Sequence, residues 1–226
     1  LARNAEQRLA QTPFFRRTKD RSAPARSTST MKQFVVLLAL IGAATSGNNL
    51  FENLDKYPLQ DECQAALQEH INVEMHASLV YMQMAAHFDN NKVARKGFST
   101  FFAENSKEER EHAQKIIDYI NKRGSTVSLV NIDMPQITTW KSVLQALRDA
   151  ISLENKVTNK LHAVHKTADE ECKDPQLMDF IESEFLEEQV TSIDKLQRMI
   201  TVLSNMDSGT GEYLLDRELL GDKKEF

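Results

Sequence analysis

Four stretches of the chain each carry an apolar pattern with helical spacing over about thirty residues, and this feature most restricts the fold. The clearest stretch runs from Lys92 to Arg123, and neither Pro nor Gly occurs between Gly97 and Gly124. In the last of the four, the pattern places Val190 on the apolar face. Alternating β-branched runs, which are typical of strands, are nearly absent. The sequence therefore predicts an all-α protein.

The predicted helices span residues 61–90, 92–123, 139–171 and 175–206, and a short amphipathic helix follows at 210–220. Gly124 is a typical residue to follow a helix end, and Asp174-Pro175 is a typical helix start. The link at residues 125–138 is long and irregular. Such a link can carry the chain from one end of a bundle to the other. We therefore expect a four-helix bundle with one long crossover between helices two and three and a short fifth C-terminal helix.

The N-terminal part differs in composition from the rest of the chain. Residues 1–30 contain seven Lys or Arg against two acidic residues and no Met, which predicts a disordered translated leader. The first Met, Met31, is followed by a lysine, a short apolar run and several small residues. That order predicts a secretory signal peptide at 31–47, cleaved near Ser46 or Gly47. The alternative is a cytoplasmic protein with an N-terminal tail and one more core segment.

Charge in the predicted folded domain, residues 48–226, argues against one class of partner. The whole chain has 28 basic and 33 acidic residues, of which eight basic and two acidic lie in residues 1–47. The domain therefore keeps 20 basic and 31 acidic residues, a net charge of −11. An acidic surface attracts cations, so we expect no nucleic-acid partner. No segment of the domain is apolar for long enough to span a membrane, and we expect no membrane partner.

The chain has two cysteines, Cys63 and Cys172, which are too few for a disulfide scaffold. Cys63 lies near the start of the first predicted helix, and Cys172 lies in the turn between the third and the fourth. In a bundle whose crossover joins helices two and three, these two points are at the same end. Geometry thus allows a disulfide within the chain or to a neighbouring subunit, and a secretory route would permit it.

Side chains that can bind metals occur near the middle of every long predicted helix. Glu109 and His112 are three residues apart, so both project from one face of their helix. The other helices offer Glu74, Glu154 and the pair Glu188-Gln189. Burying an unpaired carboxylate is costly, so glutamates on apolar faces indicate a partner or a bound metal. Carboxylates with an imidazole suit iron, zinc or manganese; a solvated surface pattern is the alternative for helices so rich in glutamate.

Several longer motifs follow one another as in a known family. They are INVEMHASLVY at 71–81, EEREHA at 108–113, LE at 153–154, DPQLMDFIE at 174–182, EQV at 188–190 and EYL at 212–214. With them the chain closely resembles eukaryotic ferritin, and its heavy, ferroxidase-active type in particular, from about Tyr57 to Gly221. The resemblance implies a ferritin-like bundle whose subunits assemble into a hollow shell of twenty-four, with or without a second chain type.

The resemblance also implies roles for the residues near mid-helix. Glu74, Glu109 and His112 would hold one iron, and Glu109, Glu154 and Gln189 the second, with Glu109 bridging. Tyr81 would lie beside this di-iron centre as a hydrogen-bond partner and electron donor. A neutral amide binds iron weakly, so iron would pass through the centre as a substrate. A second Glu-x-x-His is missing from the fourth predicted helix, which disfavours a permanent di-iron cofactor of the bacterial type.

Other acidic residues match positions in the shell of that family. Asp179 and Glu182 correspond to the lining of the three-fold channels, where a ring of carboxylates would draw Fe(II) inward. Glu108 and Glu111 would face the cavity and help to nucleate ferric mineral. The family usually has one more glutamate where this chain has Gln114.

The expected function is oxidation of Fe(II) by O₂ at the di-iron centre and storage of ferric mineral in the cavity. We expect no haem. Two other interpretations stay open: a structural or iron-transport subunit that relies on partner subunits for oxidation, and a plain helical bundle that acts as a binding module. Substituted ligands would mark a non-oxidising chain, and here all five positions are filled, which favours the enzyme. The predicted signal peptide favours a secreted ferritin.

Overall fold

The computed structural model describes residues 57–128 and 132–221, and every regular element in these ranges is helical. The elements are α2 (Asp61–Asp89), α3 (Lys96–Lys122), α4 (Val143–Thr167), the π-helical turn η1 (Ala168–Cys172), α5 (Pro175–Ile181), the π-helical turn η2 (Glu182–Leu186), α6 (Glu187–Ser204) and α7 (Ser208–Leu220). The predicted leader at 1–30 and signal peptide at 31–47 lie outside the described residues.

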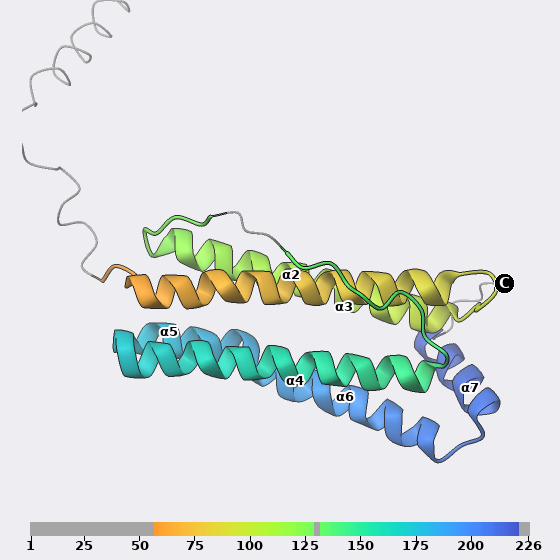
Figure 1. Cartoon of the computed structure of the whole chain (residues 1–226). Helices are drawn as coiled ribbons and strands as arrows, with labels where there is room; N and C mark the ends of the chain where they lie inside the picture. The colour runs from red at the N-terminus through yellow and green to blue at the C-terminus, as the bar shows by residue number, and fades with distance from the viewer. Residues whose placement is uncertain (1–56, 129–131, 222–226) are drawn as a thin grey trace, which may run out of the picture. The chain divides into compact units, whose positions relative to one another are not determined.

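Four long helical segments pack side by side. α2 contacts α3 and α4, and α4 contacts the fourth segment, which consists of α5, η2 and α6 (Figure 1). The short α7 contacts α3 and α6, and the crossover runs along the α2–α3 pair (Figure 1). The predicted all-α bundle with a long crossover and a short fifth helix is confirmed. Among the described helices, none has both the length and the apolar character that crossing a membrane requires.

Local backbone conformation shifts three of the predicted helix starts. The second helix begins at Lys96, four residues later than predicted, because Ala94 has a φ of 52°, which a right-handed helix excludes. The third begins at Val143, also four residues later, after the N-cap Ser142, whose side chain accepts a hydrogen bond from a first-turn N–H. The fifth begins at Ser208, two residues earlier than predicted.

The fourth segment departs from the straight α-helix predicted for residues 175–206. Asp174 caps its start as predicted, because its side chain accepts a hydrogen bond from the Leu177 N–H. The π turn η2 then takes in an extra residue, which changes the face that later side chains present. As a result Gln189 is buried, whereas Val190 is 71% exposed. The prediction that Val190 belongs to the apolar face is wrong. The third helix likewise ends in a π turn, η1.

A layer of buried polar residues divides the apolar core into two clusters. One cluster, at the end with the cysteines, includes Leu67 and Ile116, and the other, at the α7 end, includes Phe102 and Leu147. Each long segment contributes at least one buried polar residue to this layer. These residues are Glu74 in α2, Glu109 and His112 in α3, Glu154 in α4 and Gln189 in α6. The fold thus brings the predicted ligands to one level of the bundle.

The short helix α7 supplies carboxylates to the N-termini of two long helices. Oδ1 of the buried Asp216 accepts a hydrogen bond of 3.0 Å from the Phe98 N–H in the first turn of α3. Glu212 Oε1 accepts one of 3.0 Å from the Val143 N–H, where α4 begins. Acidic groups are favourable there, because a helix N-terminus has unpaired N–H groups and a partial positive charge. Gly97 permits this approach, since a Cβ there would lie 1.9 Å from the Asp216 carbonyl oxygen.

Side chains of α2 hold the crossover against the bundle. Their hydrogen bonds to the crossover join Gln64 to Thr126, Gln68 to Ser128, His76 to Asp133 and Gln83 to Thr138. These α2 residues follow one another at spacings of four, eight and seven, which keeps them on one side of the helix. The crossover therefore covers one face of α2 along most of its length.

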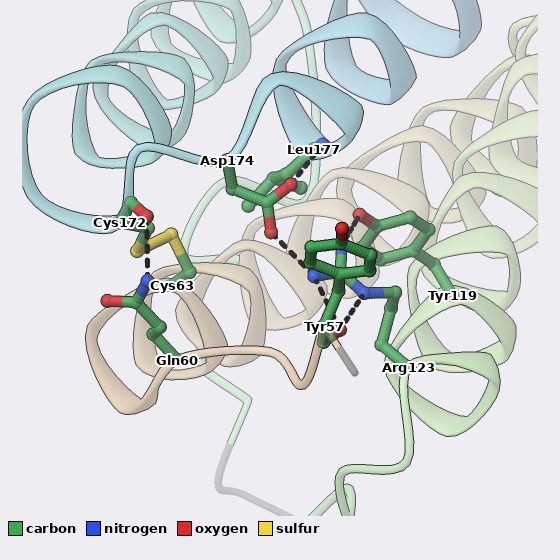
Figure 2. Close-up of a disulfide and its surroundings, with 8 residues drawn as sticks. All are labelled: Tyr57, Gln60, Cys63, Tyr119, Arg123, Cys172, Asp174 and Leu177. Carbon is green, nitrogen blue, oxygen red and sulfur yellow. Dashed lines mark hydrogen bonds and ion pairs between the residues drawn. A yellow bond between two sulfur atoms is a disulfide. The ribbon is translucent and has the colours of Figure 1, made fainter. Parts of the chain in front are cut away.

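A disulfide joins Cys63 in the first turn of α2 to Cys172 at the end of η1, with Cα atoms 6.4 Å apart (Figure 2). Gln60 Nε2 donates a hydrogen bond of 2.7 Å to the Cys172 carbonyl oxygen. Next to the bridge, Arg123 at the end of α3 forms an ion pair of 2.6 Å with Asp174. Of the two pairings that the sequence allows, the structure contains the intrachain one. The bridge joins α2 to the end of η1, and the ion pair joins the end of α3 to the turn before α5.

Loss of the disulfide should destabilise the fold without changing the helix content. The bridge joins residues 109 apart, so removing it should lower the free energy of unfolding by roughly 2–5 kcal/mol. Urea unfolding measures this with the oxidised chain, the reduced chain and a Cys63→Ser/Cys172→Ser variant. The last two should share one midpoint below that of the oxidised chain. Equal midpoints in all three samples would contradict a native bridge.

Candidate metal centre

Glu74, Glu109 and His112 come together midway along the bundle. Glu109 and His112 share one face of α3, and Glu74 approaches them from α2. One ligand atom from each residue lies within 4.8 Å of the other two. All three are buried, with exposed fractions of 0, 4 and 8% in the order named. Two carboxylates and an imidazole at this separation can hold one divalent cation.

The other predicted ligands line a cavity that Glu109 also borders. Glu154 of α4 and Gln189 of α6 contribute to its wall, and its volume is about 40 Å³. Tyr81 donates a hydrogen bond to Glu154 Oε1, and Thr158 Oγ1 donates one of 3.2 Å to Gln189 Oε1. The cavity is larger than one water molecule needs, so it can accommodate a second cation.

Glu188 and His70, which the predicted ligand set omits, also contact the centre. Glu188 Oε2 lies 2.8 Å from His112 Nε2, and His70 Nε2 lies 2.8 Å from Glu74 Oε1. The sequence indicates the contact between His70 and Glu74, because residues four apart on a helix share a face. The contact between His112 and Glu188 joins α3 to α6, so no spacing within one helix indicates it.

Burial favours the protonated forms of the carboxyl groups in the centre. It raises the pKa of Glu74 to about 7, of Glu109 to about 8 and of Glu154 to about 7. Burial lowers the pKa of His112, but hydrogen bonds to Glu109 and Glu188 outweigh it and raise this pKa to about 10. A bound cation would displace the protons, since metal ligands must be deprotonated.

Two carboxylate oxygens in the centre have no hydrogen-bond partner in residues 57–128 and 132–221. Glu74 Oε2 and Glu154 Oε2 are buried and accept no hydrogen bond from the described residues. A buried acceptor without a partner costs free energy. These atoms come from two different helices, α2 and α4, and both residues adjoin Glu109 in the same polar layer. The donor set therefore fits hard cations, which such oxygens bind well.

The residues predicted for channels and mineral nucleation are exposed, whereas the predicted iron ligands are buried. Glu108 and Glu111 are exposed on α3, and Glu108 also borders the cavity. Asp179 and Glu182 are exposed at the end of α5 and in η2. Glu182 Oε1 lies 2.6 Å from His165 Nε2 of α4. Their roles involve neighbouring subunits or the shell interior and stay predictions.

Residues 64–206 match the family model of the ferritin-like domain. The chain belongs to the ferritin family. Its relatives include soma ferritin of Lymnaea stagnalis, which is 44% identical over 159 residues, or 70% of this chain and 91% of the relative. Ferritin-1 heavy chain of Schistosoma mansoni is 43% identical over 160 residues, or 71% and 92%. Ferritin-2, chloroplastic, of Zea mays is 44% identical over 174 residues, or 74% and 68%.

These matches confirm the predicted resemblance to eukaryotic ferritin. Ferritins are iron-storage proteins of several subunits, and the family generally oxidises Fe(II). The matched range extends from the first turn of α2 to beyond the end of α6. It therefore includes every residue of the buried polar layer.

The raised pKa values predict that, without a divalent cation, this ferritin loses stability as pH rises from about 6.5 to 8. The unfolded carboxyl groups, with a pKa of 4.5, hold almost no protons in this range, whereas the folded ones still hold part of theirs and release it as the pH passes their raised pKa values. The free energy of unfolding should fall by up to about 1.4 kcal/mol per pH unit for each retained proton. The raised pKa of His112 acts in the same direction.

Urea unfolding of chelator-treated protein at both ends of this pH range tests the prediction. Zn²⁺ should stabilise the protein more at the upper end, where it competes with fewer protons. A Glu109→Gln variant lacks one of the shifted groups and should show a shallower pH dependence. Stability that rises with pH across the range would contradict the prediction.

Proposed function

We propose that the chain is a heavy-type ferritin subunit that oxidises Fe(II) with O₂ at the buried polar layer and stores ferric mineral in a shell. The observation that carries the proposal is the convergence of three glutamates, a histidine and a glutamine around carboxylate oxygens without protein partners. Such a layer destabilises a helical bundle unless cations occupy it. The relative named Ferritin-1 heavy chain supports the heavy-type assignment.

Glu109 bridges the two irons in this proposal. It belongs to the group with Glu74 and His112, and it also borders the cavity lined by Glu154 and Gln189. Carboxylate oxygens and an imidazole suit iron in both oxidation states. The amide of Gln189 is neutral and binds its iron more weakly than a carboxylate would. Iron is therefore a substrate that leaves the centre after oxidation.

The electron balance requires both sites to be filled. Two Fe(II) ions supply the two electrons that, with two protons, reduce O₂ to hydrogen peroxide, and each iron leaves as Fe(III). Burial raises the pKa of Tyr81 well above its usual value, so the phenol keeps its proton. Tyr81 then acts as a hydrogen-bond donor that orients Glu154. The alignment of Glu154 toward the cavity thus depends on this phenol.

Iron reaches the centre through a shell of twenty-four subunits, as the family resemblance implies. Asp179 and Glu182 attract Fe(II) at the channels, and Glu108 and Glu111 collect ferric product on the inner surface. The exposure of all four carboxylates supports these roles. Glu108 also borders the cavity of the centre, which supports a short path from oxidation to mineral.

A structural or iron-transport subunit without oxidase activity is the alternative. Such a chain would lack part of the ligand set, and this chain has all of it. Glu154 and Gln189, which hold the second iron, distinguish the two functions most directly, since oxidation by electron pairs needs both sites. Their position around one cavity with Glu109 favours the oxidase.

We also propose that the chain follows the secretory route. The disulfide supports it, because structural bridges persist in oxidising compartments and are rare in the cytosol. Both cysteines are buried, with 0 and 3% exposure. The relative from Zea mays is named chloroplastic, so an organelle-targeting leader is the alternative for the N-terminal residues.

Replacing the shared ligand and its neighbour should abolish the catalysed oxidation. A Glu109→Ala/His112→Ala variant should oxidise Fe(II) in air no faster than protein-free buffer, because neither iron keeps its bridging ligand. A stopped-flow record of ferric absorbance gives the rate. Glu104→Ala, at an exposed position of the same helix, is the matched control and should keep the initial rate. Equal rates for the double variant and the unchanged chain would refute the centre.

The signal peptide can be tested by N-terminal sequencing. After expression in a cell with a secretory pathway, the mature chain in the medium should begin near Gly47, since the small residues there suit signal peptidase. Intracellular protein that retains residues 1–47 would contradict secretion, and cleavage within an organelle would support the targeting alternative.

A further inference from the structure

His70 is a buried polar residue next to the metal centre. It lies on α2 between Leu67 and Ile71, which belong to the apolar cluster at the disulfide end, and 1% of its surface is exposed. A histidine in such surroundings needs a polar contact to offset the loss of water.

Glu74 provides that contact. His70 Nε2 lies 2.8 Å from Glu74 Oε1, one helical turn further along α2. Glu74 is ionised when it binds a cation and can then only accept hydrogen bonds, so the ring donates to it through Nε2–H. A pocket of about 130 Å³ between α2 and α4 borders the ring, with Glu69 and Lys160 in its wall. His70 Nδ1 is buried and has no hydrogen-bond partner among the described residues.

The two oxygens of Glu74 consequently differ. Oε1 accepts the hydrogen bond from His70, whereas Oε2 is buried and has no partner in the part of the chain that the structure describes. The ligand atoms of Glu109 and His112 lie within 4.8 Å of the carboxylate. A carboxylate held at one oxygen cannot turn freely to bind a cation through both. Oε2 is then the oxygen available to the first metal site.

We propose that His70 is a positioning residue whose Nε2–H holds Glu74 Oε1, so that Glu74 binds the first cation through Oε2 alone. The inference rests on the proposed function, because it concerns the same centre. Without this donor Glu74 can rotate, and the site formed with Glu109 and His112 weakens. His70 does not line the cavity that Glu154 and Gln189 share with Glu109, so the second site does not contact the ring.

Co²⁺ titration of the assembled, metal-free protein tests this role without any redox chemistry. Calorimetry should resolve two classes of site per subunit in the unchanged chain. His70→Leu should weaken one class by roughly 10–100-fold, as loss of a hydrogen bond to a metal ligand generally does. His70→Gln, whose amide N–H can still donate to Glu74, should restore the affinity to within a few-fold. His162→Leu, at an exposed position of α4, should leave both classes unchanged.

The outcomes separate the positioning role from its alternatives. A purely structural histidine would shift the unfolding temperature of the metal-free variants and leave the Co²⁺ affinities equal, which would overturn the proposal. Equal losses in His70→Leu and His70→Gln would make the imidazole itself a ligand and would also overturn it. If the unchanged chain binds no Co²⁺, the proposed function fails instead. Should His70→Leu not fold, His70→Met provides the same comparison, because it too lacks a donor.

Discussion

A layer of acidic groups buried in the middle of the bundle is the constraint on which the rest of the structure depends. Three glutamates and His112 lie where a helical bundle ordinarily packs apolar side chains. Removing them from water is unfavourable, and their raised pKa values reflect that cost. The apolar clusters on either side of the layer contain most of the aromatic and aliphatic side chains of the core. Their burial offsets the cost of the layer.

Both ends of the bundle are fastened by interactions that lie outside the layer. At one end the disulfide and the Arg123–Asp174 ion pair join α2, α3 and the turn before α5. At the other end Asp216 and Glu212 of α7 cap α3 and α4. A frame held at both ends prevents the helices from separating where their carboxyl groups repel one another. The ligand atoms therefore stay close together, and an arriving cation meets a site that is already formed.

The same crowding of carboxyl groups accounts for the chemistry proposed for the centre. In the proposed function, Fe(II) would take the place of the protons held by the buried carboxyl groups, so uptake of the substrate would relieve the unfavourable burial. Hydrogen bonds from residues outside the ligand set orient the ligands. They pair Tyr81 with Glu154, Thr158 with Gln189, Glu188 with His112 and His70 with Glu74. These partners come from α2, α4 and α6, and they act on ligands from all four long segments, so the geometry of the centre is a property of the whole fold.

Features that depend on neighbours within one or two helical turns could be predicted from the amino-acid sequence. Helical periodicity predicted the all-α bundle, Gly124 follows α3 with a φ of 77°, and the three-residue spacing of Glu109 and His112 places both on one face. Features that depend on how neighbouring helices are aligned could be seen only in the three-dimensional structure. In the folded chain Gln189 is buried and Val190 is not, the disulfide lies within one chain, and α6 contacts the histidine of α3. One extra residue in a π turn rotates every later side chain around the helix axis. Which face of a helix then points into the core depends on how the whole helices pack, and a local preference does not determine it.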